Sequence, residues 1–159
     1  MASGDTLISF TARSNVPPAS NYATLDERGG AIVLDFDDAT NEEATFVGVM
    51  PQNYAGGGLT VHLQWSMTSA TTGDVDWDVK LQRQTDLLGD SYAAARSSDD
   101  NTVPGTAGNV DTTSIAFTSG AQMDSIGAGD LFRLSVIRDA SSDTATGDAE
   151  LISVEIRET

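Results

Sequence analysis

Apolar and polar residues alternate along most of this chain, which is the pattern of strands with one buried face. Residues 59–67 place on one predicted inner face the side chains of Leu59, Val61, Leu63, Trp65 and Met67. Residues 74–82 repeat the alternation with Val75, Trp77, Val79 and Leu81. Because residues 68–73 have turn chemistry, we predict a β-hairpin with both tryptophans on the buried faces of neighbouring strands.

Shorter alternating segments cover residues 6–12, 31–36, 44–50, 112–118, 131–138 and 149–157, and they contain every phenylalanine of the chain. We expect the phenylalanines to face inward, and in the last segment we expect Ile152, Val154 and Ile156 inward with Leu151 outward. Residues 90–97 are a weaker strand candidate, and the best helical segment is too short to be stable alone. Many short strands between glycine-rich turns predict an all-β fold, an antiparallel β-sandwich of the jelly-roll type with about eight strands.

The 159 residues fit a single domain. Within it, residues 1–30 are expected to form an N-terminal strand and an extended arm, because residues 13–30 contain Pro17 and Pro18 and no periodic apolar pattern. Residues 31–159 are expected to form the sandwich. Residues 84–109 are the longest stretch without a clear strand pattern, and a loop longer than about 12–15 residues is usually functional or disordered.

Composition excludes several classes of site. The chain has no cysteine, so it cannot form a disulfide or a thiolate metal site, and its one histidine, His62, cannot build a multi-histidine site within one chain. Acidic residues outnumber basic ones by 24 to 8, which gives a formal net charge of −16. This charge argues against nucleic acid and anionic membranes as partners, because both are recognised through lysine and arginine.

Aspartates supply a metal candidate. Asp74, Asp76 and Asp78 alternate along one predicted strand face and could offer oxygen ligands to Ca²⁺. The EF-hand pattern fails, however, because Val79 occupies the position of the loop glycine. We favour the alternative of a solvated charged face that discourages edge-to-edge pairing, and so predict no metal and no cofactor. We also predict no catalysis, because scattered acidic residues do not single out the two carboxylates of a glycosidase.

Two kinds of side chain on the predicted outer surface suggest contacts with other molecules. Apolar residues on outward strand faces suggest an interface between subunits of a homo-oligomer, with a trimer expected, formed by Val47, Val49, Ile137 and Leu151. Sugar binding on a β-sandwich typically needs exposed aromatic rings, and the candidates are Tyr22, Tyr54 and Tyr92. The alternative for these tyrosines is that they anchor loops or an interface.

Four segments resemble small jelly-roll structural proteins of tailed bacteriophages: MPQNYAGGGL (50–59), HLQW (62–65), GDVDW (73–77) and TGDAEL (146–151). The resemblance covers about two thirds of the chain, from Phe46 to the C-terminus. It implies a virion protein on the capsid surface, a homotrimeric decoration or cement protein that binds the major capsid protein and stabilises the shell.

Under this interpretation residues 1–30 grip the capsid, and the contact candidates on the first strand are Leu7, Ser9, Thr11 and Arg13. The alternative is a receptor- or glycan-binding head of a phage fibre, and a further alternative is an acid-pair glycosidase.

Overall fold

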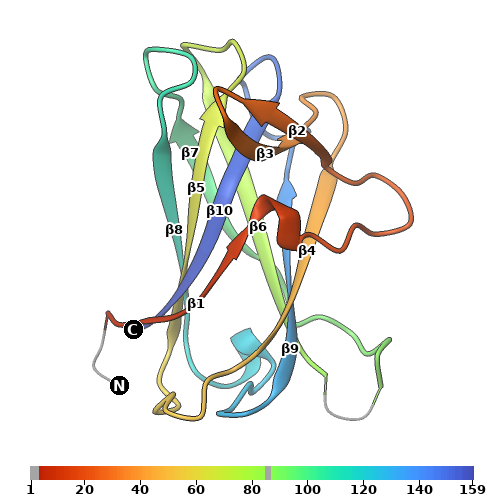
Figure 1. Cartoon of the computed structure of the whole chain (residues 1–159), viewed down its shortest axis with the longest axis vertical. Helices are drawn as coiled ribbons and strands as arrows, with labels where there is room; N and C mark the ends of the chain where they lie inside the picture. The colour runs from red at the N-terminus through yellow and green to blue at the C-terminus, as the bar shows by residue number, and fades with distance from the viewer. Residues whose placement is uncertain (1–3, 85–86) are drawn as a thin grey trace.

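The chain folds into two antiparallel sheets that pack face to face, which confirms the predicted β-sandwich (Figure 1). The computed structural model describes residues 4–84 and 87–159, so residues 1–3 of the predicted arm and 85–86 of the predicted long loop lie outside it. Sheet A has six strands: β2 (Thr24–Arg28), β3 (Ala31–Phe36), β10 (Ala149–Glu158), β5 (Leu59–Met67), β8 (Asp111–Phe117), and β1 (Thr6–Thr11), which pairs with β10. Sheet B has four strands in the order β4 (Glu42–Val49), β9 (Leu131–Arg138), β6 (Asp74–Arg83) and β7 (Arg96–Thr102).

Two short 3₁₀ turns, η1 (Ala12–Ser14) and η2 (Ala121–Met123), complete the regular structure. In the part of the chain that the structure describes, no helix has the length and apolar character needed to cross a membrane.

The alternating strands bury their apolar faces between the two sheets, as predicted. Trp65 of sheet A and Trp77 of sheet B are fully buried, and their ring centroids lie 6.0 Å apart at a steep angle. Phe36 packs edge-on against Trp77 at 5.2 Å. Edge-to-face aromatic pairs of this kind add about 0.5–1.5 kcal/mol to the stabilisation that burial itself provides.

The predicted hairpin between the two tryptophan strands is wrong. β5 belongs to sheet A and β6 to sheet B, so residues 68–73 cross from one sheet to the other and do not join neighbouring strands. The tryptophans therefore face each other across the core. A turn-rich segment of this length suits both connections, and the alternation on either side of it is the same for both.

Two residues that were predicted to point outward are buried, and a β-bulge lies beside each of them. In β10 the pairing with β5 shifts between Leu151 and Ser153, so Leu151 turns into the core and is 1% exposed, whereas it was predicted to lie at a subunit interface. In β1 the pairing with β10 shifts between Thr6 and Ile8, and Leu7, predicted to contact a capsid, is also buried. A bulge adds one residue to one strand, which reverses the side-chain alternation beyond it.

The remaining predicted contact residues do lie on the surface. Ser9, Thr11 and Arg13 are exposed, as are Val47 and Val49, and Ile137 is half-buried. The capsid contact and the subunit interface proposed for them stay predictions.

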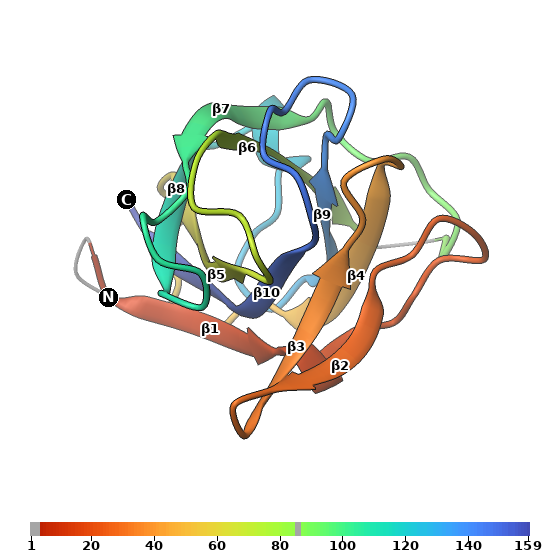
Figure 2. The same cartoon turned by 90° about the horizontal axis from the view of Figure 1, so that it is seen from above.

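Two strands differ from the sequence prediction. β2 lies inside the predicted arm, and all five of its residues are exposed, so its sequence carries no alternation of buried and exposed positions. β7 begins at Arg96, where the weaker candidate 90–97 nearly ends. β2 and β3 form a hairpin that projects from the body of the sandwich (Figure 2).

Candidate functional site

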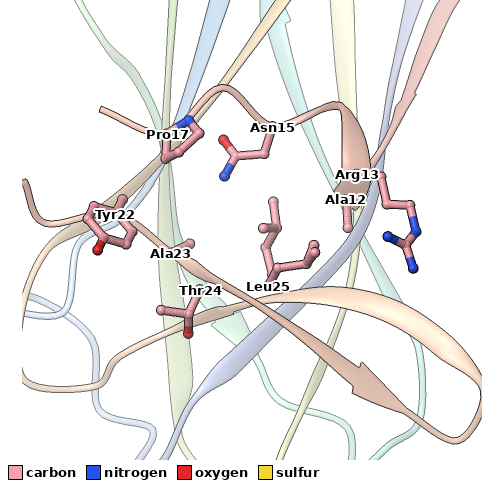
Figure 3. Close-up of a pocket in the computed structure, with 9 residues that line it drawn as sticks. Ala12, Arg13, Asn15, Pro17, Tyr22, Ala23, Thr24 and Leu25 are labelled. Carbon is pink, nitrogen blue, oxygen red and sulfur yellow. The ribbon is translucent and has the colours of Figure 1, made fainter. Parts of the chain in front are cut away.

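Residues 12–23 connect β1 to β2 and are called the arm from here on. A pocket lies between this arm and the strand β2 (Figure 3). Its volume is about 490 Å³, and it is lined by Ala12, Arg13, Asn15, Pro17, Tyr22, Ala23, Thr24, Leu25 and Leu34. Sites for small molecules are typically concave, mostly apolar and about 300–1,000 Å³ in volume, with a few polar groups that orient the ligand. This pocket has those properties and is the candidate site.

Hydrogen bonds to the edge of sheet B hold the arm in place. Val16 donates its backbone N–H to the carbonyl of Thr45 at 2.7 Å, and Ala23 donates to the carbonyl of Glu43 at 3.1 Å. The Asn15 side chain adds a third link, because its Oδ1 accepts the backbone N–H of Thr45 at 2.9 Å. The arm therefore bridges β4 of sheet B and β2 of sheet A, and both ends of the pocket are anchored.

Asn15 also supplies a donor to the pocket. Because its Oδ1 is engaged by Thr45, the amide group is oriented, and Figure 3 shows Nδ2 on the side facing Ala23 and Leu25. The buried side chain of Leu34 forms part of the pocket wall. The site thus combines an oriented amide donor with an apolar surface.

Tyr22 and Leu25 present large apolar groups to solvent at this site. Tyr22 is 46% exposed and Leu25 is 53% exposed, although both lie on well-anchored backbone. Figure 3 shows Tyr22 at one end of the pocket and Arg13 at the other, with Leu25 between them. An exposed ring can contact the C–H face of a sugar, while the amide, hydroxyl and guanidinium donors along the pocket can form hydrogen bonds with the hydroxyls of the glycan.

A second pocket of about 380 Å³ adjoins the first and shares Ala12 and Arg13 with it. Its other lining residues are Thr11, Ala31, Ile32, Ile152 and Ser153. β1 and β3 pair with successive halves of β10, and the change from one partner to the other falls at the bulge around Ile152. The second pocket occupies the gap between the end of β1 and the start of β3.

Of the three tyrosines considered for sugar stacking, Tyr22 alone is exposed within a pocket. Tyr54 is 5% exposed and donates its hydroxyl to the carbonyl of Gly57, so its candidacy as an exposed ring is wrong. Tyr92 is half-buried on the outer face of sheet B, with the charged ends of Arg133 and Lys80 at 4.8 Å and 5.0 Å from its ring centroid. These cation–π contacts give Tyr92 a packing role.

The three aspartates proposed for Ca²⁺ bind the neighbouring strand instead. Asp74 accepts the hydroxyl of Thr102 at 2.8 Å, Asp76 the backbone N–H of Asp100 at 2.7 Å, and Asp78 the hydroxyl of Ser97 at 2.5 Å. Within residues 4–84 and 87–159, no three acidic or histidine side chains come close enough to hold a metal ion. The structure therefore does not bring these carboxylates together.

His62 lies on the polar outer face of sheet A, as predicted, and lines neither pocket. Its Nδ1 is 2.7 Å from the hydroxyl oxygen of Ser114 on β8. Burial lowers the pKa of His62, and the neighbouring Arg157 lowers it further while Glu155 opposes this. A histidine that is hydrogen-bonded across two strands in this way contributes to the structure of the sheet.

The base of the projecting hairpin carries a group of carboxylates. Asp35 of β3 lies opposite Glu150 of β10, and the Asp26 carboxylate of β2 is close enough to affect its titration. Burial raises the pKa of Asp35 to about 6, and the charges of Glu150, Asp26 and Asp148 add to the rise. Glu150 is buried but paired, since Arg28 and Ser66 both donate to it at 2.8 Å.

No protein-family model and no curated protein matches the sequence. Among solved structures, the C-terminal CBM6 of a marine laminarinase from Zobellia galactanivorans matches with a TM-score of 0.57 and 12% identity, covering 95% of this chain and 98% of the other. A family 35 carbohydrate-binding module from an environmental isolate matches with a TM-score of 0.58 and 10% identity, over 96% and 94% of the two chains. The CBM22-1 xylan-binding domain from Paenibacillus barcinonensis matches with a TM-score of 0.54 and 11% identity, over 99% and 97%. These likenesses confirm the jelly-roll sandwich.

Sequence reasoning identified Tyr22 as an exposed aromatic and Arg13 as a surface contact, but it did not bring them together. Asn15, Leu25 and Leu34 were not recognised as neighbours of these residues. The sequence feature that could have indicated the site is the lack of apolar alternation in residues 13–30. A segment without core-facing residues lies on the surface, where binding residues are common.

Proposed function

We propose that this chain is a glycan-binding module, and that the pocket between the arm and β2 is its binding site. The observation that carries the proposal is the half-exposed ring of Tyr22 in a cleft of about 490 Å³ that is also lined by the polar residues Asn15 and Thr24, with Arg13 at its other end. The shared fold of carbohydrate-binding modules supports it. The proposed activity is binding without catalysis.

The proposal is tested by affinity electrophoresis in gels that contain soluble polysaccharides, with xylan, laminarin and bacterial surface polysaccharides in the panel. The wild-type chain is expected to be retarded by at least one polysaccharide. Tyr22→Ala is expected to remove the retardation, because loss of a stacking ring removes much of the contact area of a sugar.

Tyr92→Ala is the matched control, since it removes the same side chain from the outer face of sheet B. Retention of binding in Tyr22→Ala together with loss in Tyr92→Ala would contradict the assignment of the site. A wild-type chain that no polysaccharide retards would contradict the function.

Capsid decoration is a second candidate, which the resemblance to phage structural proteins implies. One observation favours it: among the described strands β1 pairs with β10 alone, so its other edge is open, and it carries Ser9 and Thr11 exposed. Such an edge can accept another chain. Removal of residues 1–15 cannot test the idea, because Phe10 packs on Phe46 in the core at 5.4 Å.

The suitable test is a Ser9→Lys/Thr11→Lys double variant, which changes the surface of β1 and keeps its buried side. If β1 is the contact, the wild-type chain should co-sediment with phage capsids that lack it and the double variant should not. Equal co-sedimentation of the two would exclude β1, and no co-sedimentation of either would exclude decoration of those capsids.

A further inference from the structure

Arg13 differs from every other basic side chain in the described residues. The others contact an acceptor within the chain: Arg28 with Glu150, Lys80 with Glu43, Arg83 with Asp130, Arg96 with the carbonyl of Ala116, Arg133 with Gln82, Arg138 with Asp143, and Arg157 with Glu155. Arg13 has no hydrogen-bond or ion-pair partner in residues 4–84 and 87–159. Among the basic side chains of the described residues, Arg13 is therefore the one whose donors are left to a ligand or to solvent.

The backbone that carries Arg13 is fixed, although its side chain makes no hydrogen bond or ion pair within the described part of the chain. Ala12 is buried, and its carbonyl accepts the N–H of Asn15 at 3.2 Å to close the turn η1. The Asn15–Thr45 hydrogen bond then ties this turn to sheet B. Arg13 lines both pockets, so this residue lies where the two pockets adjoin.

The guanidinium group suits one ligand chemistry in particular. Its planar fork of N–H donors matches a carboxylate with two parallel hydrogen bonds, and such charge-assisted bonds are about twice as strong as neutral ones. We infer that the pocket selects glycans bearing a carboxylate sugar, with Arg13 binding the carboxylate at one end of the pocket and Tyr22 contacting a sugar ring at the other end. This inference rests on the proposed glycan-binding function.

The net charge of −16 further restricts which acidic glycans the chain can bind. A densely charged polyanion would be repelled by the acidic surface as a whole. A single carboxylate at Arg13 is less affected, because charges more than about 8 Å apart are largely screened at physiological salt. The expected ligand is therefore a neutral glycan chain with isolated uronic-acid or similar acidic units.

Matched pairs of probes test this directly. They are xylotetraose with and without one glucuronic acid branch, the methyl glycosides of glucose and glucuronic acid and of galactose and galacturonic acid, and N-acetyllactosamine with and without sialic acid. Calorimetric titration is expected to show the acidic member of a bound pair binding about tenfold more tightly to the wild-type chain. Arg13→Gln should remove that preference, so that the two members of a pair bind with similar affinity.

Arg96→Gln is the control, because it removes the same charge from an exposed position on β7 that lines neither pocket. It should keep the preference for the acidic member. Equal binding of both members by the wild-type chain, or an unchanged preference in Arg13→Gln, would overturn the inference and leave glycan binding intact. Failure of every probe to bind would overturn the inference and also contradict the proposed function.

Discussion

In the core, Trp65 and Trp77 are fully buried and pack against each other across the two sheets. In the arm and β2, Tyr22 and Leu25 are about half exposed, although the backbone around Tyr22 is held by hydrogen bonds to sheet B and that of Leu25 pairs with β3. Both regions use large apolar side chains on ordered backbone. They differ in whether the protein itself covers those side chains.

This difference separates stability from binding. Apolar groups covered by the protein stabilise the fold, whereas ordered apolar groups left open are available to a ligand. Substitutions in the core should therefore change the free energy of unfolding, and substitutions in the arm should change binding with little effect on stability.

Arg138 is the most demanding test of the core. Its side chain is fully buried, forms an ion pair with Asp143 at 2.6 Å, and donates to the carbonyls of Phe36, Ala145 and Gly147. Arg138→Leu leaves a buried carboxylate and those carbonyls without donors, so we expect the free energy of unfolding to fall by about 3–5 kcal/mol. Urea denaturation measures this.

The double variant Arg138→Leu/Asp143→Leu should recover part of the loss, since it removes the unpaired carboxylate as well. If the single variant loses less than about 1 kcal/mol, the hydrogen bonds of Arg138 do not hold the loop of residues 139–148 to β3.

Asp35 lies on β3, between the body of sheet A and the exposed strand β2. A substitution at Asp35 therefore probes the boundary between the two regions. Its pKa is raised to about 6 from 3.8, so the folded chain holds the proton more tightly than the unfolded chain. The ionised carboxylate therefore destabilises the fold above the folded pKa, and this destabilisation disappears as the pH falls toward the unfolded value.

Asp35→Asn is expected to raise the free energy of unfolding by about 1 kcal/mol at about pH 7.5 and to change it little at about pH 4. Thermal unfolding at the two pH values measures the difference. A variant that is less stable than wild type at the higher pH would show that the ionised carboxylate stabilises the hairpin.

Tyr22→Ala should have the smallest effect on stability. Because its ring is half exposed and lies at the edge of a pocket, we expect a change within about 0.5 kcal/mol in urea denaturation. A loss above about 2 kcal/mol would mean that Tyr22 belongs to the packing of the arm, and the contrast between the two regions would fail.

The core was predictable because alternation determines which side chains are buried, as Trp65 and Phe132 show. The bulges that bury Leu7 and Leu151 were not predictable, since an extra residue in one strand leaves no mark in composition. The strand β2 was not predicted because all its residues are exposed, so its sequence has no alternation of apolar and polar positions. Residues of the pocket meet through the long-range bond between Asn15 and Thr45, which no local pattern encodes.

The most direct test of the central claim is a two-dimensional NMR titration of the ¹⁵N-labelled chain with the tightest-binding soluble oligosaccharide of the probe set. We expect the shifted amide signals to concentrate in residues 12–25 and 31–34, around the two pockets. Shifts concentrated on the outer face of sheet A around His62 and Ser114, or around Tyr92 on sheet B, would contradict it.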